Sequence, residues 1–138
     1  MINSRGIGQE FKAFSSQQMH EFLNEVSGVN FVMLCSSDGF ELSLASKKNI
    51  ENTGKIAAVS SSILAMVSSF ISEIQLVGCQ TITLDAENGK VFLTAVNHPH
   101  NPMVIVAVTN EDILLGQMLY CFKKLSASLT TAQIQKAS

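Results

Sequence analysis

The stretch TGKIAAVSSSILAMVSSFISEIQL, residues 53–76, decides the fold of this 138-residue chain. It contains no charged residue between Lys55 and Glu73, and its apolar residues recur at helical spacing. Asn52 or Thr53 would cap the helix, and Gly78 would end it. On a helical wheel the large apolar side chains gather on one side, which we expect to pack on a sheet. They are Ile56, Val59, Ile63, Val67, Phe70 and Ile74.

The opposite side of this helix carries only small residues. They are Ala58, Ser61, Ser62, Ala65, Ser68, Ser69 and Ser72. A helix face exposed to water usually carries charged residues, whereas a face of alanine and serine lets another backbone approach closely. The pattern is open to a solvated serine-rich face, but it favours contact with the same helix of a second copy. On that hypothesis Ala65→Arg would give a monomer or an insoluble protein.

Strands and two further helices surround the long helix. A hairpin with a Ser37-Asp38-Gly39 turn is predicted before it, and three strands follow it. The expected strands are 29–35, 40–46, 79–86, 90–97 and 103–108, and the other helices run from about 15 to 27 and from a Thr109 cap to about 127. The order α-β-β-α-β-β-β-α predicts one α+β domain over residues 15–129, with tails at 1–14 and 130–138.

The strand expected at 79–86 has features of an interface. It contains no proline and no lysine, and its outer alternation presents Cys79, Thr81 and Thr83. If this strand lies at the edge of the sheet, it lacks the usual protection against pairing with another edge. Two copies would then join their sheets, so we add these three residues to the expected dimer interface.

Composition limits the class of protein. The net charge is −2 and only 14% of residues are charged, which argues against an electrostatic nucleic-acid binder or a polybasic membrane anchor. The N-terminus lacks the apolar stretch of a signal peptide, and no apolar run reaches the length of a membrane span. The three cysteines form no paired motif. We therefore expect a cytoplasmic protein with reduced thiols.

Candidate chemistry is sparse. There is no phosphate-binding glycine-rich loop, and the serines lack the context of a catalytic nucleophile. His98 and His100 have no further metal-ligating residue at ligand spacing. We therefore predict no enzyme activity, no cofactor and no metal. Lys47, Lys48 and Lys55 cluster before the long helix, and they form either a solvated loop or a docking site for an acidic partner.

Three segments together resemble the Roadblock/dynein light-chain domain family, whose bacterial members regulate Ras-like GTPases. They are SGVNFVMLCSSDGFELSLAS (27–46), KIAAVSSSILAMVSSF (55–70) and NEDILLGQMLYCFKKL (110–125). The resemblance implies a profilin-like α/β/α layered fold with strand order 2-1-5-4-3. It also implies dimerisation through the central helix and an edge strand, with the dimer serving as a platform for a Ras-like small GTPase.

The partner hypotheses differ in class. The first is a non-enzymatic homodimer that binds and regulates or localises a small GTPase. The only arginine is Arg5, in the expected tail, so no arginine finger is evident. The alternatives are a scaffold dimer without a GTPase partner and a profilin-like sensory domain with a small ligand between sheet and helices.

Overall fold

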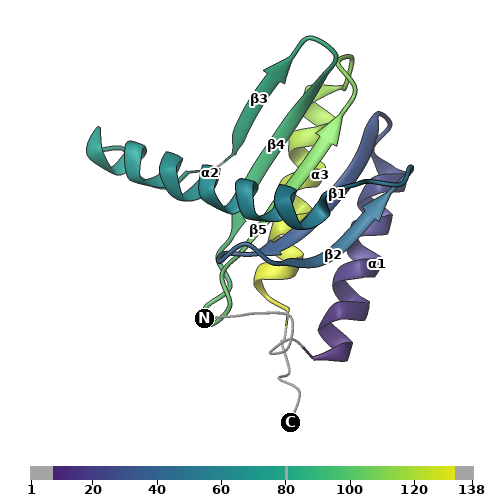
Figure 1. Cartoon of the computed structure of the whole chain (residues 1–138), viewed down its shortest axis with the longest axis horizontal. Helices are drawn as coiled ribbons and strands as arrows, with labels where there is room; N and C mark the ends of the chain where they lie inside the picture. The colour runs from purple at the N-terminus through teal and green to yellow at the C-terminus, as the bar shows by residue number, and fades with distance from the viewer. Residues whose placement is uncertain (1–7, 80, 133–138) are drawn as a thin grey trace.

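The computed structural model of the chain describes residues 8–79 and 81–132. Three helices and five strands alternate in the predicted order (Figure 1). They are α1 (Gln9–Glu25), β1 (Val29–Ser36), β2 (Glu41–Ser46), α2 (Thr53–Glu73), β3 (Ile82–Ala86), β4 (Gly89–Val96), β5 (Met103–Thr109) and α3 (Leu115–Thr130).

The five strands form one antiparallel sheet in the order β2-β1-β5-β4-β3, as predicted. β5 lies in the middle and is almost wholly buried, because its continuous apolar sequence suits a strand covered on both faces. α2 crosses one face of the sheet, while α1 and α3 cover the other (Figure 1). The molecule therefore has the expected three α/β/α layers, with β2 and β3 at opposite edges.

The two faces of the sheet have unequal cores. Beneath α1 and α3, Phe122 packs against Phe22 and Phe92, with ring centroids 5.9 and 6.4 Å apart. The core beneath α2 is smaller, and Ala57 is the one residue of α2 among its fully buried members. α2 is thus held mainly by its N-terminal half, because its later residues bury little against the sheet.

α1 begins at Gln9, well before the predicted start near Ser15. Phe11 is buried in the core, so residues 9–14 belong to α1 and not to the expected tail over residues 1–14. Residues 1–7 of that tail lie outside the described residues. The sequence misled because Ser15 interrupts the apolar pattern. Ser15 is nevertheless buried, and its Oγ lies 2.7 Å from Ser43 Oγ on β2.

α2 ends at Glu73, earlier than predicted. The amide of Leu76 donates to the carbonyl of Ile71, and the amide of Gln75 donates to that of Ser72. These two bonds make a Schellman ending in which Gln75 takes the left-handed conformation, with φ of 63°. The chain then reaches β3 only at Ile82, so the strand is shorter than the predicted 79–86.

α3 begins without the predicted Thr109 cap. Thr109 ends β5, where it is buried and donates its hydroxyl to the carbonyl of Asn110. The residue before the helix is Leu114, and its side chain offers no capping hydrogen bond. The loop between strand and helix is therefore longer than the capping pattern indicated.

Candidate interaction surface

The faces of α2 differ from those predicted. The side chains buried in α2 are Ala57, Ser60 and Ser61, whereas Val59 and Phe70, which were expected on the sheet, are 48% and 63% exposed. Ser61 donates its hydroxyl to the carbonyl of Ser36 on β1, 3.0 Å away. Small residues therefore bring α2 close to its own sheet. The predicted sheet-packing face is confirmed at Ile56, which packs against the core beneath α2, but it is wrong at Val59 and Phe70.

The β1–β2 turn explains part of the small-residue pattern. Gly39 has φ of 99°, and a β-carbon placed on it would lie 3.2 Å from the α-carbon of Ala58. A larger residue at the turn would both strain the backbone and press on the helix. Ala58 and Gly39 thus let the turn pass close to α2, which is a contact within one chain.

Several large apolar residues of α2 form a stripe beside the sheet-packing side, which we call the apolar flank. It comprises the exposed residues Val59, Met66, Phe70 and Ile74 and the half-buried residues Ile63 and Val67. Met66 and Phe70 are 64% and 63% exposed. Single exposed apolar residues are common on protein surfaces, whereas a group of neighbouring ones marks an interaction site. In Figure 1 the C-terminal half of α2 projects beyond β3, so nothing in the described chain covers this part of the flank.

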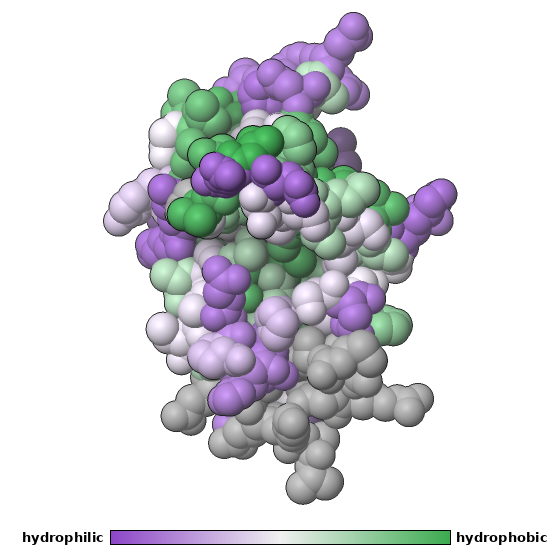
Figure 2. All heavy atoms as spheres, turned by 90° about the vertical axis from the view of Figure 1, so that its left-hand side faces the viewer, coloured by the Kyte–Doolittle hydropathy of each residue, from purple (hydrophilic) through white to green (hydrophobic). Residues whose placement is uncertain are grey.

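The other residues predicted for the dimer interface occupy three places. Ser61 is buried, which rules it out as a surface residue of the free chain; Ser62, Ala65 and Ser69 are exposed on α2, and Thr83 is exposed on β3. A cavity of about 630 Å³ brings the remaining four together, namely Ser68, Ser72, Cys79 and Thr81. Figure 2, viewed from the side where α2 projects, shows this hollow beside the hydrophobic surface.

β3 adds a second exposed apolar element on the same side of the molecule. Within the described residues β3 pairs only with β4, so its other edge is open. Leu84 is 41% exposed, and Leu76 and Val77, which precede β3, are 58% and 94% exposed. The end of α2, residues 76–77 and β3 therefore each expose an apolar side chain on this side of the molecule.

α2 is also the helix of the described residues that is long and apolar enough to cross a membrane, by length and composition alone. Only 17% of its most apolar window is buried. The same composition arises when a helix packs on a sheet with one side and on another protein with a second side. The hydrogen bond from Ser61 to β1 shows which side of α2 packs on the sheet.

The predicted basic cluster is divided. Lys47 and Lys48 are exposed and line a second cavity of about 700 Å³ at the β2 edge. Lys55 lies in the first turn of α2 and does not line that cavity. In the described part of the chain, no lysine of this cluster forms an ion pair.

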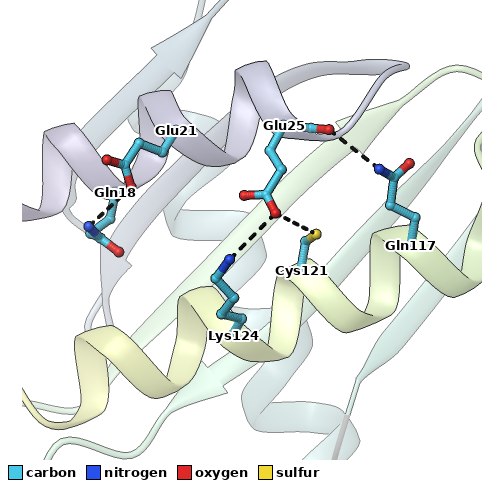
Figure 3. Close-up of polar contacts among 6 residues, drawn as sticks. All are labelled: Gln18, Glu21, Glu25, Gln117, Cys121 and Lys124. Carbon is cyan, nitrogen blue, oxygen red and sulfur yellow. Dashed lines mark hydrogen bonds and ion pairs between the residues drawn. The ribbon is translucent and has the colours of Figure 1, made fainter.

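A polar contact joins the two helices of the opposite layer (Figure 3). Glu25 at the end of α1 accepts hydrogen bonds from Lys124 and from the Cys121 thiol, and its backbone carbonyl accepts one from Gln117. Burial, followed by this contact with Glu25, raises the pKa of Cys121. The cluster ties α1 to α3 and keeps the thiol protonated.

The environments of Cys35 and His98 are typical of structural residues. Burial, with a smaller effect of Glu41, raises the pKa of the Cys35 thiol to about 12, which makes Cys35 a poor nucleophile. His98 donates from Nε2 to the carbonyl of Ala132 and accepts the amide of His100 at Nδ1. Among the described residues no three metal-ligating side chains gather.

These features define a three-layer α/β/α domain with an apolar helix flank beside the open edge of β3. The chain belongs to the Roadblock/LC7 domain family, which matches residues 16–108, more than half of its length. The recognition made from the three sequence segments is confirmed. Among curated proteins, none matches the sequence.

Solved structures of bacterial Roadblock proteins share the fold. "MglB with tetrameric arrangement" aligns with a TM-score of 0.82 at 15% identity, covering 94% of this chain and 95% of that chain. MglB of Thermus thermophilus, described as a gliding protein, aligns at 0.81 with 15% identity, covering 94% and 96%. Myxococcus xanthus MglB aligns at 0.79 with 17% identity, covering 89% of each chain.

Sequence reasoning missed the apolar flank as a surface. Large apolar side chains are usually buried, so Val59, Met66 and Phe70 were assigned to the core or its margin. One signal pointed the other way: the helix lacks charge over most of its length, as expected when more than one side is covered. Its length relative to a five-stranded sheet was a second signal, since a helix of 21 residues spans about 30 Å.

Proposed function

We propose that the chain is one subunit of a homodimer that binds a Ras-like small GTPase in the cytoplasm. The dimer joins the apolar flanks of two α2 helices and the open edges of two β3 strands. It regulates or localises its partner without catalysing a reaction itself. The observation that carries this proposal is the apolar flank, because water is a poor environment for Met66 and Phe70.

The position of the flank supports a second copy as the covering partner. α2 projects past β3, so a two-fold axis near β3 would lay this projecting half over the partner's sheet. Leu84 and Val91 lie on the α2 face of the sheet at that edge and are incompletely buried. Pairing of the two β3 edges would satisfy the open backbone groups at the same time.

This arrangement revises the interface inferred from the sequence. The small residues near the start of α2 serve the contact with the chain's own sheet, as Ser61 and Ala58 show. The interface proposed here uses Val59, Met66 and Phe70 in their place. The predicted use of the β3 segment, including Thr83, is retained as part of the proposal.

Membership of the Roadblock/LC7 family supports a GTPase as the further partner, as does the likeness to MglB structures. The raised thiol pKa values of Cys35 and Cys121 fit a binding module better than a catalyst. The three cysteines are free, in keeping with a reducing compartment.

Two neighbouring substitutions test the dimer. Met66→Arg places a charge on the apolar flank, whereas Ala65→Arg places the same charge about 100° away around the helix. We expect the wild type and Ala65→Arg to have a mass near twice 14.9 kDa by light scattering, and Met66→Arg to be monomeric. If Met66→Arg is dimeric and Ala65→Arg is monomeric, the dimer interface lies on the alanine and serine side of α2 and not on the apolar flank.

Co-purification with nucleotide tests the GTPase. The tagged dimer is passed over lysate of its own organism in the presence of GDP or a non-hydrolysable GTP analogue. We expect a small GTPase to be retained with one nucleotide in preference to the other. Binding of other proteins that is indifferent to nucleotide would favour the scaffold dimer instead.

A further inference from the structure

The cavity at the β2 edge has a basic wall and an apolar wall. Lys47 and Lys48, which follow β2, and His20 of α1 supply the basic wall. Leu44 and Ile50 supply the apolar wall. A site of this composition suits a ligand that carries negative charge beside an apolar group.

The cavity is an open hollow at the C-terminal end of β2, which is an edge strand of the sheet. In the described part of the chain β2 pairs with β1 alone. His20 belongs to the helix layer on one face, whereas Leu44 packs into the core on the α2 face. The cavity therefore has walls from both faces and adjoins the end of the β2 edge, where an extended segment could add as a further strand.

The positive charge at this edge forms no ion pair with the residues that the structure describes. Neither Lys47 nor Lys48 lies within 4.0 Å of a carboxylate among the described residues. The carboxylate of Glu21, next to His20 in sequence, accepts hydrogen bonds from Gln17 and Gln18, the second of which is drawn in Figure 3. Glu21 is thus engaged along its own helix.

Local hydrogen bonds fix the basic wall. The hydroxyl of Ser46 accepts the amide of Lys48 and donates to the carbonyl of the same residue, which holds the link in a tight turn. His20 donates from Nδ1 to the carbonyl of Ser16, 2.8 Å away. This bond leaves Nε2 as the ring nitrogen available to a ligand.

We propose that this edge cavity binds an acidic, extended segment of a protein partner, which pairs with β2 and places carboxylates against Lys47 and Lys48. A second copy of the chain is a poor occupant, because it would bring the same lysines face to face. Two lysines are also fewer cations than anionic membranes or nucleic acids usually require. An acidic segment with an apolar residue matches both walls.

The inference rests on the proposed function in one respect: the acidic segment is taken to belong to the small GTPase. The cavity lies at the edge opposite β3, so it remains open when two β3 edges join. Binding at β2 and dimerisation are therefore separable by experiment.

Nuclear magnetic resonance of the isotopically labelled full chain tests the site. The probe is a short peptide of glutamate, threonine and leucine, and its counterpart with glutamine in place of glutamate is the control ligand. We expect amide shifts at Ser46–Ile50 and His20 with the acidic peptide only. The double variant Lys47→Glu with Lys48→Glu should weaken binding by about tenfold or more.

Lys123→Glu is the matched control variant, because Lys123 is exposed on α3 and lies far from this cavity in the fold. Its binding should equal that of the wild type. Equal binding of the acidic and glutamine peptides, or shifts scattered over the surface, would overturn the proposal. So would tighter binding to phosphatidylserine vesicles or inorganic phosphate than to the peptide.

Light scattering of the same samples separates the two proposals. A monomeric protein that still binds the acidic peptide at β2 would refute the dimer and leave the edge site standing. A dimer that ignores the peptide would refute the edge site alone, in which case the lysines only guard β2 against pairing with other edges.

Discussion

Ser61 and Ser62 are neighbours in sequence with different environments. Ser61 is buried and bonds β1 through the carbonyl of Ser36, whereas Ser62 is exposed and bonds Ala58 in its own helix. Ser61→Ala should lower the free energy of unfolding by about 1 kcal/mol, because it removes a buried hydrogen bond. Ser62→Ala should leave it within about 0.5 kcal/mol of the wild type.

Urea unfolding of the two variants measures this difference. Equal effects of the two substitutions would contradict the face that we assign to the sheet. The pair thus tests the orientation of α2 without any partner protein.

The thiol of Cys35 links stability to alkaline pH. Burial and Glu41 raise its pKa from 9.0 to about 12, so the folded chain keeps this proton after the unfolded chain has lost it. Stability is complete below pH 9 and falls as the pH rises through the window between these two values. The slope from this one group is about 1.4 kcal/mol per pH unit.

Cys35→Ala removes the group and is the control for that measurement. Its unfolding free energy should be lower at neutral pH but should fall less steeply from pH 9 upward. Identical slopes for the variant and the wild type would show that Cys35 does not carry the effect.

At the end of α2, a glutamine occupies a backbone conformation that favours glycine. Gln75 takes a left-handed conformation that costs a residue with a side chain roughly 1 kcal/mol relative to glycine. Gln75→Gly should therefore raise the melting temperature and stabilise the fold by about that amount. Ala127→Gly, at an exposed position inside α3, should instead destabilise by about 1 kcal/mol.

Thermal unfolding followed by circular dichroism compares these variants. Destabilisation by both would mean that the backbone at position 75 is not left-handed in solution. The expected opposite signs arise because glycine is introduced into a left-handed conformation at position 75 and into a helix at position 127.

The elements themselves could largely be predicted from local sequence. The Asp38-Gly39 turn and the apolar run of β5 have short-range causes, so the hairpin and the central strand were predicted correctly. The start of α1 was missed because the partner of Ser15 is Ser43, which is distant in sequence. Local periodicity carries no information about such a contact.

The candidate surface could be predicted only in part. Periodicity separates the large residues of α2 from the small ones, but it does not say which set meets the chain's own sheet. That choice depends on how closely Ser61 and Ala58 approach β1 and the Gly39 turn. Tertiary packing settles this choice, so the sequence placed Ile56 correctly but assigned Val59 and Phe70 to the wrong side.

At the scale of the whole molecule, the proposed dimer predicts that stability depends on concentration. Association of folded subunits stabilises them by mass action. The melting temperature of the wild type and of Ala65→Arg should rise with protein concentration, whereas that of Met66→Arg should stay constant. A constant value for the wild type over the same range would contradict a reversible dimer.

The strand order has a consequence at larger scale, because β2 and β3 lie at opposite ends of the sheet. Joining two β3 edges would leave one β2 edge at each far end of the assembly. The two basic cavities would then be separate, identical and outward-facing. One dimer would thereby act as a bivalent clamp, whose avidity for partners in a row along a surface or filament exceeds the affinity of either cavity alone.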